Sequence, residues 1–321
     1  MVAKENMKKT ASRVAALAVC ALLCAVSLGS LGCAAGETTV EKLGSDSPST
    51  DKPSGDESLA ESGRESQRVS ADGLVDALDR SVSYAVDREV YHNVTVDTSS
   101  GYLTERDGLN FHVEYPQMKG LSEEKEAVVN EAVRDRAMLW VDKMYLDPSG
   151  DVQKFLRNHN ATEGKYLGSQ VESFITRNDE HSMSIAFVDN YMIGSVYSEY
   201  RDLRTLNVNL DTGERWHYTN EIVKATPEFA TIWLERSREQ RGSTALHERV
   251  PLDDVVAILQ NDDRIANRYF SDFFVDADGN ICIAISYHVG DDVGIARGFT
   301  WASFSREELE PHRVESPFWS M

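Results

Sequence analysis

The stretch Leu109-Asn110-Phe111-His112-Val113-Glu114-Tyr115 alternates strictly between apolar and polar residues. Successive side chains of a β-strand point to opposite faces of the sheet, so a period of two places all the apolar side chains of this stretch on one face. The pattern predicts a strand with one face in the core and the other in solvent. We expect Pro116 to end this strand, because proline has no amide hydrogen for the sheet ladder.

The segment after this strand changes to helical spacing. Ser122 is a suitable N-cap, and Glu123 and Glu124 follow it in the expected first turn, where the helix dipole favours negative charge. Apolar residues then recur every three or four positions as far as Met144. These features predict a helix that packs against the strand and ends before Pro148.

The rest of the chain alternates short strands with single helices. Asp278-Gly279 lies between two apolar runs, which is a strong signal for a hairpin. Strand pairs interrupted by single helices predict an α+β fold with antiparallel sheets and packed helices. We expect strands at 90–96, 165–175, 182–188, 191–200, 206–210, 272–275, 281–289 and 298–304, a turn at 177–180, and helices at 74–84, 227–240, 252–260 and 306–309.

The first residues have the pattern of an export signal. A basic segment, 8–13, precedes an apolar run of 18 residues, 14–31, near the lower limit of the roughly 17–25 residues that a spanning helix needs. The run leads into Gly32-Cys33, which resembles the lipobox of bacterial lipoproteins, although Ser30 stands where leucine is usual. The resemblance implies a lipid on Cys33 and anchoring in the lipid bilayer at the outer face of the cell membrane. An ordinary cleaved signal peptide and an uncleaved anchor helix are the alternatives.

The composition changes after the leader. Residues 34–72 contain eight serines and almost no large apolar side chains, so they bury too little surface to offset the entropy of ordering, and we expect a disordered linker. With Cys33 acylated, Cys282 is the only other cysteine outside the leader, so we expect no intrachain disulfide. We divide the chain into a signal peptide at 1–33, this linker, and α+β modules at 73–200 and 201–321.

The charge of the chain limits its partners. The formal net charge is −20, and residues 1–33 carry four basic and one acidic side chain, so the remainder carries −23. We expect no nucleic-acid partner, because phosphate binding requires a basic face. A cationic protein is favoured electrostatically, although acidity also serves solubility alone.

Two sets of short motifs resemble a known pair of exported modules. Phe111 to Leu121, with its Tyr-Pro and Gly-Leu pairs, followed by Asn130 on the predicted helix, is similar to the non-catalytic N-terminal module of PdaC-type peptidoglycan deacetylases. The stretches 206–213, 219–223, 283–287 and 298–304 are similar to the extracytoplasmic module of RsiV-type anti-sigma factors, whose known member senses lysozyme. The resemblance covers about residues 90–315 and implies an envelope-facing binding or sensing module. The stretch 195–204 departs from it, because it lacks the family's Gly-Gly-Ala-His-like residues.

The sequence carries no recognisable catalytic, metal or cofactor motif. Its eight histidines lack the spacing of a zinc site. In 276–280 a glycine follows the second aspartate directly, which predicts a turn rather than an EF-hand loop. Cys282 lies in an apolar alternating run and is interpreted as a core residue. We therefore predict no catalytic residue, no metal and no cofactor, while the many carboxylates leave an acidic catalytic pair open.

Aromatic residues concentrate between positions 191 and 218. Tyr197, Tyr200, Trp216 and Tyr218 are our candidate ligand-binding residues, because aromatic rings suit both sugars and protein interfaces, with core packing as the competing interpretation. Our leading hypothesis is a lipid-anchored binding or sensing protein for a cationic wall-active protein such as lysozyme, or for peptidoglycan. The alternatives are a peptidoglycan hydrolase or deacetylase-like enzyme, and a structural or assembly lipoprotein.

Overall fold

The computed structural model describes residues 73–76, 85–93, 108–148, 150–158, 166–194, 199–262, 269–291 and 294–321. All of these residues belong to one compact unit. Cys33, the segment 34–72 and Tyr197 lie outside the described residues, so the predictions made for them rest on the sequence.

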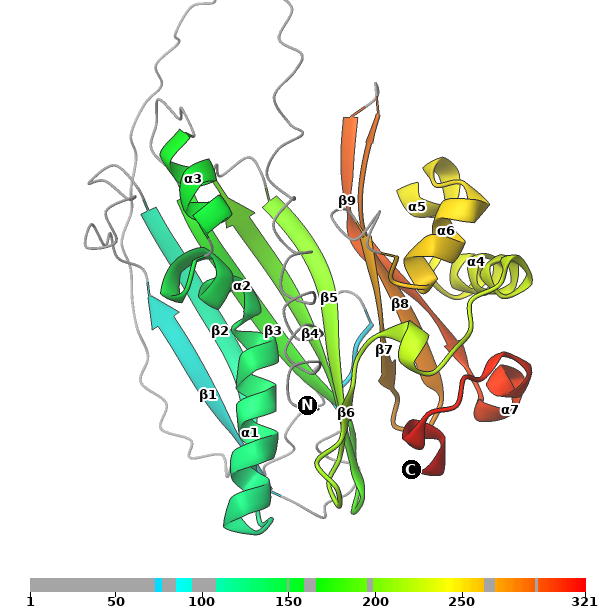
Figure 1. The fold of residues 1–321 in the computed structure, drawn as a ribbon, viewed down its shortest axis with the longest axis horizontal. Helices are drawn as coiled ribbons and strands as arrows, with labels where there is room; N and C mark the ends of the chain where they lie inside the picture. The colour runs from blue at the N-terminus through cyan, green and yellow to red at the C-terminus, as the bar shows by residue number, and fades with distance from the viewer. Residues whose placement is uncertain are drawn as a thin grey trace, which may run out of the picture. The chain divides into compact units, whose positions relative to one another are not determined.

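The first of two sheets has six strands in the order β1-β2-β3-β4-β5-β6 (Figure 1). Neighbouring strands are antiparallel except β2 and β3, which run parallel. A parallel pair needs a crossover connection, and the helices between β2 and β3 provide it. The elements are β1 (Ala85–Asn93), β2 (Gly108–Lys119), α1 (Glu123–Ala137), α2 (Leu139–Val141), η1 (Asp142–Leu146), α3 (Gly150–Asn158), β3 (Tyr166–Asn178), β4 (Ser182–Ile193), β5 (Glu199–Asn209) and β6 (Arg215–Trp216).

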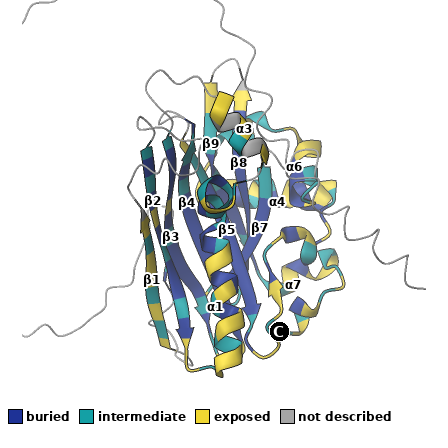
Figure 2. Ribbon diagram, turned by 60° about the vertical axis from the view of Figure 1, so that its left-hand side comes forward, coloured by how far each residue is buried: buried dark blue, intermediate teal, exposed yellow. Residues whose placement is uncertain are grey.

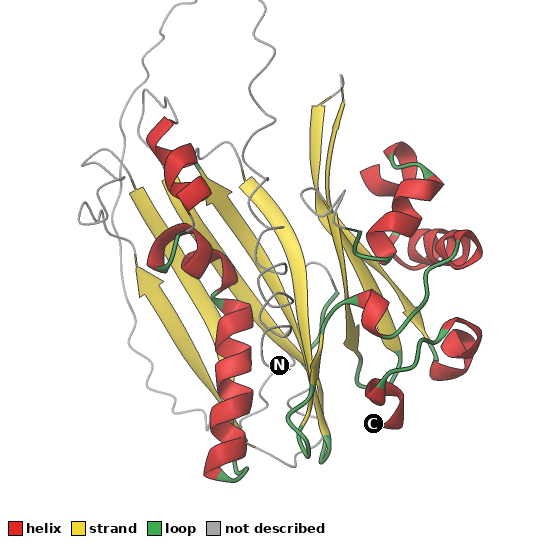
Figure 3. Ribbon diagram, viewed as in Figure 1, coloured by secondary structure: helices red, strands yellow, loops and turns green. Residues whose placement is uncertain are grey.

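The second sheet is an antiparallel meander of three strands (Figure 3). The helices α4–α6 precede this sheet in the sequence, and α7 follows it. The elements are η2 (Thr219–Glu221), α4 (Pro227–Arg241), α5 (Ala245–Arg249), α6 (Leu252–Leu259), β7 (Tyr269–Val275), β8 (Ile281–Asp291), β9 (Gly294–Phe304), α7 (Arg306–Leu309), η3 (Glu310–His312) and η4 (Pro317–Ser320).

Three buried clusters define the layers. One face of the first sheet packs against α1, with Phe111 and Val133 in the same cluster. One face of the second sheet packs against α4–α6, through Ile283 and Trp233 among others. The third cluster lies between the sheets, and its residues alternate with those of the other two clusters along β3, β4, β5, β7, β8 and β9. Figure 2 shows buried residues concentrated in the strands. The inter-sheet cluster contains Leu74, Phe174, Ala186, Val188, Leu203, Phe274, Cys282, Ala284 and Trp301.

The structure confirms the α+β class and most of the expected elements, but Pro116 does not end its strand. β2 continues to Lys119 and pairs Pro116 with Arg88 of β1. On its other side, β2 pairs with β3 only as far as Val113, so at Pro116 it behaves as an edge strand, where proline is tolerated. Asn130 of α1 takes the place of a strand neighbour, because its side-chain amide bonds both the N–H and the C=O of Met118 at 2.7 and 3.1 Å.

Smaller differences concern the ends of elements. The expected helix at 74–84 is wrong where the structure describes it, because Gly73 to Asp76 is not helical and Val75 forms a single β-bridge. Of the expected turn at 177–180, Arg177 and Asn178 belong to β3. The proposed module boundary after residue 200 falls inside β5, which begins at Glu199.

Candidate binding surface

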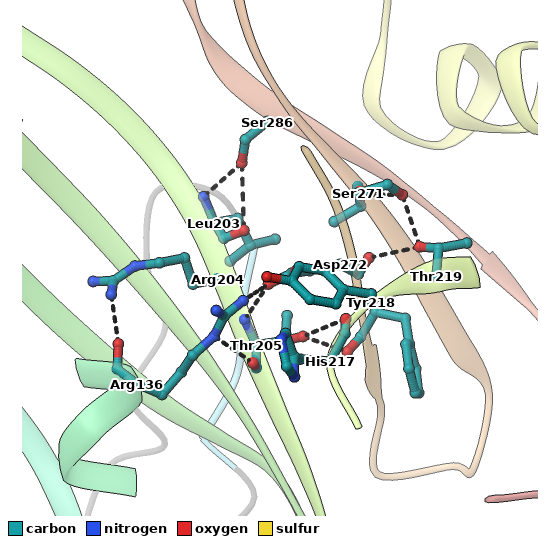
Figure 4. A network of polar contacts seen from close by, with 12 residues as sticks. Arg136, Leu203, Arg204, Thr205, His217, Tyr218, Thr219, Ser271, Asp272 and Ser286 are labelled. Carbon is teal, nitrogen blue, oxygen red and sulfur yellow. Dashed lines mark hydrogen bonds and ion pairs between the residues drawn. The ribbon is translucent and has the colours of Figure 1, made fainter. Parts of the chain in front are cut away.

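The two sheets are joined along the outer edge of β5. β6 pairs with β5 only at Asn207 and Val208, so the backbone from Leu203 to Thr205 has no strand neighbour on that side among the described residues. Side chains of the second sheet bond it instead. The N–H of Leu203 donates to Ser286 Oγ at 2.9 Å, and the N–H of Thr205 donates to an Asp272 carboxylate oxygen at 2.9 Å (Figure 4). At this place, which we call the joint, side-chain hydrogen bonds thus replace the backbone hydrogen bonds of a strand pair.

Asp272 and Arg136 form the centre of this joint. Asp272 is buried, and its carboxylate forms an ion pair with the Arg136 guanidinium. Arg136 Nε also donates to the carbonyl of Thr205 at 2.9 Å, so one arginine from α1 bonds both sheets. Burial raises the pKa of Asp272 to about 6, while the charge of Arg136 and the Thr205 N–H act in the opposite direction. A buried carboxylate is costly unless it is paired in this way.

A second buried ion pair lies deeper in the same region. Arg204 is 1% exposed, and its guanidinium pairs with Asp189. It also donates to the carbonyls of Arg136 and Ala137 at the C-terminal end of α1, where carbonyls lack partners within the helix. Ser169 Oγ donates to Asp189 at 2.9 Å. The position of α1 relative to β5 is therefore set by charge-assisted hydrogen bonds.

The chain passes from the first sheet to the second between Trp216 and Thr219. The carbonyl of His217 accepts a hydrogen bond from the Phe273 N–H at 2.9 Å, and Tyr218 forms a β-bridge with Asp272. The backbone amides of His217 and Tyr218 both donate to Glu221 Oε2 at 2.8 Å. These bonds fix the backbone of Tyr218 directly above the joint.

The Tyr218 side chain lies at the surface of this fixed segment. It is 38% exposed, with the Arg136 guanidinium 5.9 Å from its ring centre and the His217 ring at 3.9 Å. Burial lowers the pKa of the His217 imidazole to about 3, and Arg136 adds to this effect, so His217 is neutral at physiological pH. Partial burial also raises the pKa of Tyr218. Tyr218 is thus a neutral, preorganised aromatic group.

Exposed carboxylates lie along α1, whose Arg136 packs over the Tyr218 ring, and in the β5–β6 turn. Lys125 Nζ lies 3.9 Å from Asp211 Oδ1, and a Cβ on Gly213 would lie 3.6 Å from the Val128 side chain, so α1 and this turn are in contact. Val128 is 41% exposed. We define the acidic strip as the exposed residues Glu123, Glu124, Val128, Glu131, Asp135, Asp211, Glu214 and Tyr218.

The four predicted aromatic residues do not form one cluster. Tyr200 stacks on Tyr191 at 4.9 Å, and Tyr191 stacks on Trp140 at 4.2 Å, in a column at the start of β5. Trp216 is 7% exposed and belongs to the core of the second sheet. It pairs with Asn207, seven positions after Tyr200, which is about 23 Å along a strand. Tyr218 alone lies on the acidic strip, and Tyr197 is outside the described residues.

Two other groups with catalytic potential, His247 and Cys282, have structural explanations. His247 bonds Ser237 Oγ at 2.7 Å and the Thr244 N–H at 3.0 Å, at the start of α5. Cys282 is buried, and burial raises the pKa of its thiol to about 12, which disfavours the nucleophilic thiolate. No group of three or more metal-ligating side chains occurs within the described part of the chain. Its helices are also too short or too polar to cross a membrane.

Sequence reasoning missed Arg136 and Asp272, the two residues at the centre of the joint. Arg136 occupies a polar position of the α1 pattern, and Asp272 opens an expected strand, so both fit ordinary local structure. Their pairing spans 136 positions. The only local signal was Asp272 itself, a charged residue at the start of an otherwise apolar strand.

Comparisons with known proteins do not identify this protein. No protein-family model matches the sequence, and no curated protein matches it significantly. Among solved structures, the chain is similar to a member of the DUF3298 family from Bacteroides fragilis, with 12% identity and a TM-score of 0.43 over 75% of this chain and 98% of the other. It is also similar to a DUF3298 family protein from Pseudomonas aeruginosa, with 11% identity and a TM-score of 0.35 over 72% and 94% of the two chains. At these values the comparisons assign neither a family nor a function.

Proposed function

We propose that this protein is an exported, lipid-anchored binding module that recognises a cationic wall-active protein, such as lysozyme, through the acidic strip. The observation that carries the proposal is the position of Tyr218. It is an exposed aromatic ring whose backbone is fixed above a buried ion pair, and α1 and the β5–β6 turn, which lead to this place, carry exposed carboxylates. The motif resemblance to lysozyme-sensing exported modules supports the same class of ligand.

The chemistry of the strip suits a cationic protein. Six carboxylates face solvent there. The nearby cations are Lys125, Arg134, Arg136 and Arg215. Opposite charges of this kind accelerate encounter and fix orientation, and salt screens them. An exposed tyrosine supplies contact area at low entropic cost and is enriched at protein hot spots. Because the joint already fixes the Tyr218 backbone, little ordering is required on binding.

The test compares two triple variants with the same change in net charge. Glu124→Gln/Glu131→Gln/Asp135→Asn neutralises three of the six carboxylates of the strip, and Glu228→Gln/Glu235→Gln/Glu239→Gln neutralises three exposed carboxylates on α4. Binding of hen lysozyme to the full-length protein in detergent is measured by calorimetry. We expect the strip variant to bind at least about tenfold more weakly than wild type and the α4 variant to bind within about threefold. Equal weakening in both variants would show general charge attraction rather than recognition by the strip.

Salt dependence is the second arm of this test. Raising the salt concentration from about 50 to about 300 mM shortens the Debye length and should weaken wild-type binding at least about tenfold. The same change should affect the strip variant less. Affinity that is independent of salt, or absent for lysozyme, contradicts the proposed ligand class.

The anchor is tested separately from the ligand. Cys33 is the proposed acylation site, and Cys33→Ser removes the thiol that would carry the lipid. Wild-type protein should incorporate labelled palmitate and remain with membranes, while the variant should do neither. Mass spectrometry of the mature N-terminus distinguishes a lipidated Cys33 from a simple cleaved leader or an uncleaved helix.

A further inference from the structure

A hollow of about 430 Å³ opens beside the inter-sheet core, and none of its lining residues belongs to the acidic strip or to the ion pairs of the joint. Its size falls within the range of small-ligand sites. It lies where the end of α4, the β7–β8 turn and β9 meet residues 73–75. The lining consists of Gly73, Leu74, Val75, Thr176, Gln240, Arg241, Phe274, Asp276, Ala277, Asp278, Cys282, Trp301 and Ser303.

Arg241 is the distinctive residue of this hollow. Its guanidinium lies 3.7 Å from the centre of the Trp301 ring, and it makes no hydrogen bond or ion pair with any described residue. Arg136 and Arg204, in contrast, are paired with buried carboxylates. Arg241 is an exposed residue, and partial burial of its guanidinium lowers its pKa. A cation stacked on an aromatic ring with unused N–H donors is a ready partner for a carboxylate.

The other lining residues indicate what else the ligand of this hollow contains. Phe274, Trp301 and Leu74, each at most 3% exposed, form the apolar inner wall of the hollow, and Thr176 and Gln240 add polar atoms. This mixture suits a ligand with both an apolar group and amides. Asp276 is committed to its own turn, where its carboxylate accepts the N–H groups of Asp278 and Asn280 at 2.9 Å.

The negative charge of that turn also limits the ligand. Asp276 and Asp278 both line the hollow, so a phosphate or another multiply charged anion would be repelled. A single carboxylate that pairs with Arg241 avoids most of this repulsion, and an ammonium group elsewhere on the ligand would be attracted.

We propose that this hollow binds the C-terminal carboxylate of a short peptide, with Arg241 as the carboxylate partner and Trp301 and Phe274 in contact with an apolar side chain. The site is separate from the acidic strip and does not depend on capture of a cationic protein. The ligand class is therefore a small zwitterionic or monoanionic peptide.

The test uses the full-length protein and two probes, the dipeptide alanyl-phenylalanine and its C-terminal amide. The amide removes the carboxylate and leaves the rest of the peptide unchanged. Calorimetry should show at least about tenfold tighter binding of the acid than of the amide to wild type. Arg241→Gln should abolish this preference. Arg238→Gln, an exposed arginine in the same last turn of α4, should retain it.

Three results would overturn the proposal. They are equal affinity for acid and amide, no binding of either probe up to roughly 10 mM, and an unchanged preference in Arg241→Gln. The first two use only wild-type protein, so they decide the question even if Arg241→Gln fails to fold. The outcome is also distinguishable from failure of the proposed function, because lysozyme binding by the strip is expected to persist in Arg241→Gln.

Discussion

The tyrosines near the two ends of β5, Tyr200 and Tyr218, have different surroundings. At the start of the strand, Tyr200 lies between Tyr191 at 4.9 Å and the His288 ring at 4.7 Å, and Arg297 packs over it at 4.3 Å. At the other end, beyond β6, Tyr218 sits on a joint of buried ion pairs with its ring 38% exposed. Tyr200 is held by other rings, whereas Tyr218 is held by its backbone.

This difference separates a structural aromatic residue from one that is available to a ligand. A ring enclosed by neighbours contributes its apolar surface to folding. A ring whose backbone is fixed by other groups can leave part of its surface to solvent without losing its position. We therefore assign Tyr200 to the stability of the fold and Tyr218 to recognition.

The largest expected effect comes from breaking the joint beneath Tyr218. Asp272→Ala leaves the buried end of Arg136 and the N–H of Thr205 without their acceptor. Removing one partner of a buried ion pair typically costs about 3–5 kcal/mol, and we expect the free energy of unfolding in urea to fall by that amount. Asp272→Asn, which keeps an acceptor oxygen, should lose less. A loss below about 1 kcal/mol for Asp272→Ala would mean that the joint does not hold the sheets together.

The next largest effect concerns the aromatic column at the start of β5. Tyr191 is 4% exposed and stacks on both Trp140 and Tyr200. Tyr191→Ala should lower the free energy of unfolding by about 3 kcal/mol, as is usual for buried aromatic residues. Under conditions where the variant stays folded, lysozyme affinity should be unchanged. A selective loss of affinity without loss of stability would reverse the roles assigned to the two ends.

Local periodicity explains how much of the fold the sequence could predict. The alternation in β2 and β8 and the helical spacing of α1 and α4 reflect single faces turned to a core, and these elements lie close to where they were expected. Asp278-Gly279 marked the β7–β8 hairpin for the same reason, because turn chemistry is local. The antiparallel second sheet follows directly from short connections.

Features that depend on distant partners could not be predicted in this way. The parallel pairing of β2 with β3 depends on where α1 returns the chain, and the persistence of β2 through Pro116 depends on Asn130 occupying the vacant edge. The joint links residues whose sequence neighbourhoods look ordinary. Proximity in sequence grouped Tyr200 with Tyr218, but the length of β5 separates them.

The pH dependence of stability gives a smaller effect at the Tyr218 end. The pKa of His217 is lowered to about 3, against about 6.5 in an unfolded chain, so between these values only the unfolded state binds the proton. Its contribution to stability is therefore lost as the pH falls from about 6.5 towards 3. The free energy of unfolding of His217→Gln should therefore fall less steeply with decreasing pH than that of wild type. The two slopes should differ by at most about 1.4 kcal/mol per pH unit.

The buried carboxylates act in the opposite direction in the same window. The raised pKa of Asp272, about 6, means that its contribution is lost as the pH rises from about 4 to 6. Because Asp272 is present in both wild type and His217→Gln, comparing urea unfolding at several pH values isolates the histidine. Parallel pH profiles for the two proteins would contradict the assignment of a buried neutral imidazole.

The smallest effect on stability is expected at Tyr218 itself. Tyr218→Ala removes a ring that is 38% exposed but leaves the backbone bonds to Glu221 and Phe273 intact. We expect a loss of less than about 1 kcal/mol in thermal or urea unfolding. Lysozyme affinity should nevertheless fall about tenfold, as for an interface hot spot. Unchanged affinity would show that Tyr218 does not contribute to lysozyme binding.

The most direct test of recognition by the acidic strip is backbone hydrogen exchange of the full-length protein with and without bound lysozyme. The account predicts slower exchange in α1 (Glu123–Ala137) and in residues 210–218 on binding, with little change in α4 (Pro227–Arg241). Protection confined to α4–α6, or to the start of β5 around Tyr200, would contradict it.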